Sequence, residues 1–244
     1  MARHLQIKIG MFLLFLYLSI GIIQAVPCSG SETCVEDIQS ALSVSPQEGA
    51  EASVKADAFA DKGLRPEVLS IALKAWQHAW DKGDTQKKVL TVIDYSLPSD
   101  QHRLWIIDLE TGKLLFHERV AHGKNTGGKL AKWFSNVNNS KKSNLGVLKT
   151  AETYMSGKFG YSLRLDGLEQ GFNHNARRRA IVMHRAPYTT DEYVDRHGRL
   201  GRSWGCPALD PKVTDAIIDT IKEGSIIVGY VPDAKWLEES EYLK

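Results

Sequence analysis

The sequence has few cysteines, almost no net charge, and no apolar run of the length that a membrane-spanning helix requires. Its 244 residues include three cysteines, and 31 basic against 29 acidic side chains leave a formal net charge of +2. Such a balance gives no indication of nucleic acid as a partner. There is also no Gly-rich phosphate-binding loop before a helix pattern and no internal repeat, so neither a nucleotide-binding nor a repeat architecture is indicated.

The N-terminus has the composition of an export signal. The basic residues Arg3 and Lys8 precede the apolar run Met11–Val26, which is short for a membrane span and has the small residue Ala25 near its end. We therefore expect residues 1–25 to be a secretory signal peptide, and the mature protein to lie in the periplasm or cell envelope without a membrane span. The alternatives are an uncleaved N-terminal anchor and lipoprotein processing at a cysteine after the run.

The three cysteines fall into a close pair and a single residue. Cys28 and Cys34 lie near each other in a Ser- and Glu-rich segment, and in an exported protein we expect a disulfide between them. Cys206 is then unpaired, between Gly205 and Pro207, which favour a turn. An unpaired thiol in an oxidising compartment needs a use, and the simplest is nucleophilic catalysis. The alternatives are a buried, inert cysteine and a structural disulfide with one of the other two.

His184 is the candidate base for that nucleophile. It follows the apolar run Ala180–Met183, so we expect it at the end of a buried strand, where it is held rigidly. An imidazole that takes the thiol proton makes Cys206 a strong nucleophile. The backbone N–H groups of Trp204, Gly205 and Cys206 are the candidate oxyanion hole, and this combination predicts acyl transfer through a thioester.

Apolar patterns predict a mainly β domain with a few helices, of the α+β class. Apolar residues repeat at helical spacing from Leu69 to Trp80, which predicts a helix that starts at Pro66 and ends at Gly83. The turn at Thr111-Gly112 predicts a hairpin, and a second helix is expected over Pro211–Glu223. The predicted strands are Val89–Tyr95, Arg103–Leu109, Lys113–Ala121, Gly146–Tyr154, Tyr161–Leu165, Ala180–His184 and Ser225–Val231.

After the expected signal peptide, the sequence predicts three parts of the chain. Residues 26–60 have no sustained apolar period and are expected to be a tether, residues 61–232 to be one folded domain, and residues 233–244 to be an acidic, peripheral tail. Two long connections, Gly123–Leu145 and Gly167–Arg179, have the length of loops that are often functional.

The sequence Ser-Trp-Gly-Cys resembles the Ser/Thr-x-Gly-Cys signature of the murein L,D-transpeptidases, the YkuD-type catalytic domain, and further motifs resemble one exported branch of that family. The resemblance extends from Leu64 to Val231. It implies a β-sandwich-like catalytic domain with an N-terminal helix, Cys206 as nucleophile, His184 as base, and no cofactor or metal. The matching motifs are Val120–Asn125, Phe134–Asn136, Gly160–Leu165, Gly167–Glu169, Asn175–Arg177, Ile181–His184 and Gly201–Leu209.

The resemblance also implies a third group, a backbone carbonyl or a small polar residue just after the histidine. Arg185 stands there, where glycine or serine is expected, so its carbonyl is the candidate, and its long side chain either crowds the acceptor channel or binds a carboxylate. The general signature has a histidine where this chain has Trp204, so the role of that histidine is not carried over. Ser203 is a candidate to orient Cys206 or His184, or else a turn residue that bonds its own backbone.

The implied reaction takes place on peptidoglycan stem peptides. The Cys206 thiolate attacks the carbonyl of the third stem residue of a tetrapeptide donor, D-Ala leaves, and an acceptor amine resolves the thioester. Acylation by carbapenems is a further implication. The alternatives are an L,D-carboxypeptidase or hydrolase on the same scaffold and a non-catalytic peptidoglycan-binding protein.

The stem peptide is anionic, and arginine suits the bidentate capture of carboxylates. We therefore expect Arg202, Arg164 and Arg185 to bind substrate, and Tyr188 and Tyr161 to line the cleft. The histidines at 122, 174 and 197 match no tight zinc spacing, so no metal site is expected.

Overall fold

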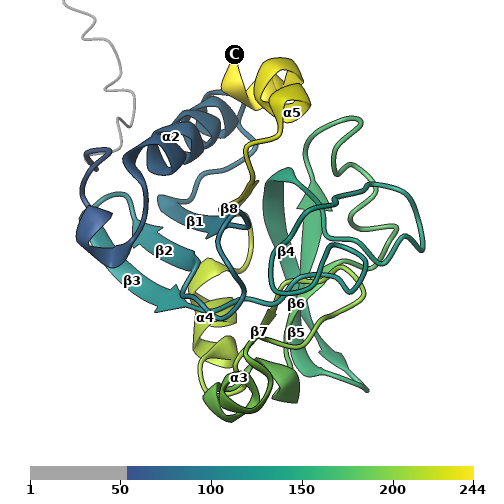
Figure 1. Ribbon diagram of the computed structural model, residues 1–244. Coiled ribbons are helices and arrows are strands. Elements are labelled where there is room, and N and C mark those ends of the chain that lie inside the picture. The colour runs from purple at the N-terminus through teal and green to yellow at the C-terminus, as the bar shows by residue number, and fades with distance from the viewer. Residues whose placement is uncertain (1–53) are drawn as a thin grey trace, which may run out of the picture. The chain divides into compact units, whose positions relative to one another are not determined.

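The described residues of the computed structural model are 54–244. The expected signal peptide, the expected disulfide between Cys28 and Cys34, and most of the expected tether lie outside the described residues. Figure 1 shows the described part as a sheet with helices on both sides.

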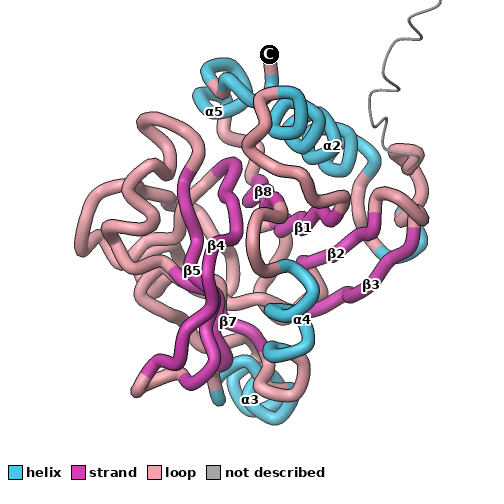
Figure 2. The backbone as a smooth tube through the Cα atoms, turned by 180° about the vertical axis from the view of Figure 1, so that it is seen from behind, coloured by secondary structure: helices cyan, strands magenta, loops and turns pink. Residues whose placement is uncertain are grey.

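Eight strands form one mixed sheet in the order β3-β2-β1-β8-β4-β5-β6-β7. Neighbouring strands are antiparallel except for β1 with β8 and β6 with β7, which are parallel. A bridge between Ala121 and Ala208 joins the segment after β3 to β7, so the sheet is nearly closed and barrel-like (Figure 2). The strands are β1 Val89–Asp94, β2 Leu104–Asp108, β3 Lys113–Glu118, β4 Gly146–Ser156, β5 Gly160–Gly167, β6 Val182–Arg185, β7 Ala208–Leu209 and β8 Ile226–Tyr230.

The helices cover different parts of this sheet. α2 packs on β1 and β8, while α4 packs on β5 and β6 (Figure 1). Pro66 begins α2 because its missing N–H and fixed φ suit the first helical position. The helices are η1 Ala60–Lys62, α2 Pro66–Asp81, η2 Pro187–Thr189, α3 Asp191–His197, α4 Thr214–Ile221, α5 Ala234–Glu239 and η3 Glu241–Leu243.

Both faces of the central strands are buried, which explains why their sequences are continuously apolar. In β1, Leu90 and Val92 point into one apolar cluster together with α2. Ile93 points into a second cluster, which includes Ile217 and Ile218 of α4. The sheet therefore separates two cores. The strands next to the candidate site pack into the second cluster through Met183 and Leu209, and Ala208 belongs to a third, smaller cluster.

The predicted α+β class with an N-terminal helix is confirmed, and the strands form a single, nearly closed sheet. The prediction that the C-terminal tail is peripheral is wrong. Trp236 is fully buried and Tyr242 is 2% exposed. Trp236 Nε1 donates to the buried Glu169 carboxylate at 3.0 Å, and Ser240 donates to the same group. At the other end, Phe59 belongs to the first core cluster although it lies in the segment expected to be a tether.

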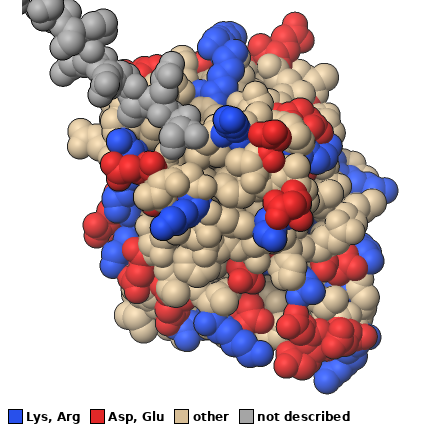
Figure 3. Space-filling view, turned by 90° about the vertical axis from the view of Figure 1, so that its left-hand side faces the viewer, with Lys and Arg blue, Asp and Glu red and all other residues tan. Residues whose placement is uncertain are grey.

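Acidic and basic side chains are interspersed over the face seen in Figure 3, so the nearly neutral charge of the sequence is also locally balanced there. No helix within residues 54–244 is both long enough and apolar enough to cross a membrane.

Candidate active site

His184 lies on β6, and Cys206 lies just before the neighbouring strand β7. β6 and β7 are parallel, with His184 paired to Ala208, and Cys206 lies in the loop that leads into β7. Cys206 is half-buried with a free thiol, whereas His184 is 1% exposed. The thiol donates to the carbonyl oxygen of Ala180 at 3.7 Å, and no hydrogen bond joins it to His184 within the described residues. Catalytic hydrogen bonds are often loose without substrate and tighten when it binds.

His184 is held in one orientation and one tautomer. Its Nδ1 lies 2.8 Å from the carbonyl oxygen of Arg185, which can only accept, so Nδ1 carries the proton and Nε2 is free to accept one. Its ring stacks on Phe159 with the centroids 3.9 Å apart. Burial lowers the pKa of His184, the Arg185 carbonyl opposes this, and the nearby charge of Lys158 lowers the pKa further. At neutral pH the imidazole is therefore an unprotonated base.

The thiol of Cys206 is protonated in the resting site. Burial raises its pKa, and this effect exceeds the opposite influence of the Val182 backbone N–H and the Arg179 guanidinium. Cys206 and His184 are thus both neutral, which favours proton removal by His184 during attack over a preformed thiolate–imidazolium pair.

Ser203 fixes the turn that presents Cys206. Its Oγ donates to the Cys206 carbonyl oxygen at 2.6 Å and accepts from the Gly205 N–H at 3.0 Å. Ser203 therefore bonds the backbone of its own turn, which was one of the two alternatives. Because the Gly205 N–H is occupied, Trp204 and Cys206 remain as the candidate oxyanion donors. Gly205 has a φ of +129°, and a Cβ there would lie 2.7 Å from the Lys142 carbonyl oxygen, so only glycine fits.

The long connection after Gly123 is part of the site. The Lys124 N–H donates to the Ser203 carbonyl at 2.8 Å, and the Gly123 N–H donates to Ser143 Oγ at 3.0 Å. Ser143 Oγ in turn donates to the Gly205 carbonyl at 3.1 Å. Both ends of this connection are therefore fixed against the Cys206 turn.

A buried Arg103–His122 pair supports the same turn and was not found from the sequence. Arg103 is fully buried, and its Nη2 donates to His122 Nδ1 at 2.9 Å. His122 Nε2 lies 3.1 Å from the Gly128 carbonyl oxygen, and the His122 carbonyl accepts from the Ser203 N–H at 3.0 Å. The only signal in the sequence is an arginine at the start of an apolar strand.

Acidification is expected to destabilise the fold through His122. Burial and then the charge of Arg103 lower the pKa of His122 from 6.5 to about 4. Below pH 6.5 the unfolded chain therefore binds a proton that the folded chain excludes, so stability falls as pH drops toward about 4. The full loss is about 3 kcal/mol. Urea unfolding at pH 7 and pH 4.5 measures it.

The matched variant is His122→Asn, whose Oδ1 can still accept from Arg103 but does not titrate. It should lose less stability than the parent between the two pH values. An equal loss in both proteins would contradict a role for His122 in acid sensitivity.

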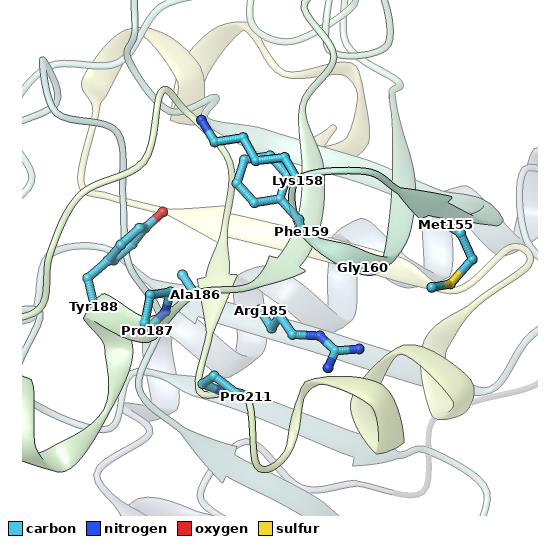
Figure 4. A pocket seen from close by; sticks show the side chains of 9 residues that line it. All are labelled: Met155, Lys158, Phe159, Gly160, Arg185, Ala186, Pro187, Tyr188 and Pro211. Carbon is cyan, nitrogen blue, oxygen red and sulfur yellow. The ribbon is translucent and has the colours of Figure 1, made fainter.

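An open pocket of about 700 Å³ lies beside His184. Figure 4 shows Lys158 and Phe159 on one side of it, and Tyr188 with its hydroxyl directed toward them. Burial, with a smaller effect of the nearby Cys206, raises the pKa of Tyr188 to about 12, so its hydroxyl stays protonated. The guanidinium of Arg185 points away from Tyr188 in the same view. The lining residues are Met155, Lys158, Phe159, Gly160, Arg185, Ala186, Pro187, Tyr188 and Pro211.

The arginines expected to bind substrate have partners within the protein. Arg185 pairs with Asp215 at 3.0 Å, and Arg164 pairs with Glu152 at 3.1 Å. Arg202 donates to the carbonyls of Lys124 and Gly127.

Of the two tyrosines, Tyr188 lines the pocket beside His184, whereas the Tyr161 hydroxyl donates to Asp219 at 2.8 Å. Within residues 54–244 no group of three His, Cys, Asp or Glu side chains is placed to hold a metal ion.

Comparison with solved structures places several L,D-transpeptidases among the similar chains. One from Mycobacterium smegmatis has 15% identity and a TM-score of 0.39, with 59% of each chain covered. An LD-transpeptidase in complex with imipenem has 15% identity and a TM-score of 0.38, again with 59% of each chain covered. One from Stackebrandtia nassauensis has 15% identity and a TM-score of 0.36, covering 74% of this chain and 78% of the other.

The match thus spans about 59% of the length of the first of these proteins. A search of curated proteins found no match. A family model described as the L,D-transpeptidase catalytic domain matches residues 60–230, well over half of the chain, and the chain therefore belongs to the L,D-transpeptidase catalytic domain family.

Proposed function

We propose that this protein is a peptidoglycan L,D-transpeptidase of the cell envelope in which Cys206 is the nucleophile and His184 its base. The observation that supports this most directly is the state of His184. It is buried and neutral, and its Nδ1 proton is committed to the Arg185 carbonyl at 2.8 Å. Nε2 is thereby the basic nitrogen, and the free thiol of Cys206 lies in the loop that leads into β7, the strand paired with the one that holds His184.

In the first half of the proposed reaction, His184 Nε2 takes the proton of the Cys206 thiol as Sγ attacks the carbonyl carbon of the third stem residue. The N–H groups of Trp204 and Cys206 are the candidate donors to the oxyanion that develops. The C–N bond to the terminal D-Ala then breaks, and the imidazolium returns the proton to the leaving amine. The products are free D-Ala and a thioester on Cys206.

In the second half, an acceptor amine attacks the thioester and transfers a proton to His184. The new amide forms as the C–S bond breaks, and the proton returns to the thiolate. The pocket beside His184, lined by Tyr188 and Phe159, is open enough to admit one of the two peptide segments.

The experiment that tests the function uses the purified chain and disaccharide-tetrapeptide as both donor and acceptor. Mass spectrometry is expected to detect D-Ala release together with a crosslinked dimer. A sample whose thiol is blocked with iodoacetamide should show neither product.

D-Ala release without a dimer would instead indicate water as acceptor, and hence a carboxypeptidase. No release by a folded protein with a free thiol would contradict the proposal.

A further inference from the structure

An exposed tryptophan two residues before Cys206 is surrounded by lysines. Trp204 is 68% exposed. The Nζ atoms of Lys141, Lys124 and Lys158 lie 4.7, 5.8 and 5.9 Å from the centroid of its ring. We call these four residues the Trp204–lysine patch. Lys124 and Lys141 come from the long connection after Gly123, and Lys158 comes from the turn between β4 and β5.

Hydrogen bonds fix two of the lysines beside the ring. The Lys124 N–H donates to Ser203, directly before Trp204, and the Lys141 carbonyl accepts from the Asn125 N–H at 3.0 Å. A Cβ on Gly123 would lie 2.6 Å from the Lys141 carbonyl oxygen and 3.0 Å from Gly205 Cα, so these segments are in direct contact. These contacts therefore fix the backbone of Lys124 and Lys141 beside the turn that carries Trp204.

The charges of the patch are not neutralised by any carboxylate within the described residues. Within residues 54–244, none of the three ammonium groups has a carboxylate oxygen within 4.0 Å. The arginines near the site differ in this respect, since Arg185 and Arg164 are paired with Asp215 and Glu152. Like charges held close together repel each other, and a bound anion removes that repulsion.

We propose that the Trp204–lysine patch is a subsite that holds a carboxylate-bearing segment of the substrate next to Cys206. The ammonium groups face the carboxylates, and the exposed indole face packs against the apolar or sugar portion between them. The identity of the ligand in this inference rests on the proposed function. In this proposal the lysines, and not the arginines expected from the sequence, bind the carboxylates of the stem peptide.

The test measures binding without turnover, in the full chain carrying Cys206→Ala. Disaccharide-tetrapeptide is titrated by calorimetry, and the same compound with its carboxylates converted to amides is the neutral probe. The main variant is Lys124→Gln with Lys141→Gln. Lys158 is left in place because its charge also lowers the pKa of His184.

The double lysine variant is expected to weaken binding of the anionic probe about tenfold and to lose the preference over the amidated probe. Trp204→Leu should weaken both probes about fivefold. The matched control removes exposed lysines elsewhere, Lys113→Gln with Lys212→Gln, and should bind as the parent does.

Binding of the anionic probe that stays within twofold of the parent in both the double lysine variant and Trp204→Leu would overturn the proposal. Failure of the proposed subsite can be distinguished from failure of the proposed function. A protein that transfers no acyl group but binds the anionic probe through these residues keeps the subsite and loses the transpeptidase assignment. If a protein with the lysine and tryptophan substitutions and an intact Cys206 still crosslinks normally, the proposed function is supported and the proposed subsite is contradicted.

Discussion

The Cys206→Ala variant is expected to form no acyl-enzyme and to release D-Ala at least about 10³-fold more slowly than the parent chain. The proposed mechanism has a covalent thioester, and no other free thiol exists within residues 54–244. The candidate oxyanion donors, the backbone N–H groups of Trp204 and Cys206, remain in the variant, so any residual rate measures what they contribute alone. Intact-mass spectrometry of the protein with tetrapeptide donor detects the acyl adduct or its absence.

Loss of activity in Cys206→Ala is informative only if the fold is retained, and the structure indicates that it is. The residue is half-buried, and the hydrogen bond that its thiol donates is the weak 3.7 Å contact with the Ala180 carbonyl oxygen. Thermal unfolding should therefore change by about 1 kcal/mol or less. A Cys206→Ala protein that still released D-Ala at the parent rate would remove Cys206 from the mechanism.

The sequence predicted those parts of the fold that depend on local signals. The hairpin of β2 and β3 follows from a Thr-Gly turn between two apolar runs, and α2 follows from helical spacing between Pro66 and Gly83. β7 was not predicted because two residues, Ala208–Leu209, are too few to show a period of two. α5 was not predicted because its buried face is essentially Trp236, whose partner Glu169 is distant in the sequence.

The candidate site was predictable where the chemistry lies in one short motif and not where distant segments meet. Cys206 and His184 were predicted as candidates from their own neighbourhoods, and the structure has His184 on β6 and Cys206 just before the paired strand β7. Which cations are free to bind an anion was not predictable, since it depends on partners far along the chain. Arg185 pairs with Asp215, whereas no carboxylate oxygen among residues 54–244 lies within 4.0 Å of the Lys124 or Lys141 ammonium group.

The Arg103–His122 pair was not predictable for the same reason. Its two residues come from different segments of the chain, and the sheet brings them together. The His122 carbonyl accepts from the Ser203 N–H, so the pair helps to hold the turn that precedes Cys206. The support of Cys206 therefore comes from segments that the sheet brings together, not from the short motif around it.

His184→Gln is expected to slow acylation of Cys206 by about 10³-fold and to change the shape of its pH profile. In the parent, burial holds the pKa of His184 below its usual value, so the base is already unprotonated at neutral pH and the rate is flat there. The parent rate falls only as pH drops through that lowered pKa. Without the base, attack depends on the small thiolate fraction of a thiol whose pKa is raised by burial.

The rate in His184→Gln should therefore rise about tenfold per pH unit from pH 6 to pH 8, whereas the parent rate should change by less than about threefold over that range. Stopped-flow or mass-spectrometric acylation with a carbapenem or the tetrapeptide donor gives both profiles. The matched control is Phe159→Leu, which removes the stacked ring 3.9 Å from His184 but keeps the base. It should lower the rate without adding the pH slope. A flat profile in His184→Gln would show that another group removes the Cys206 proton.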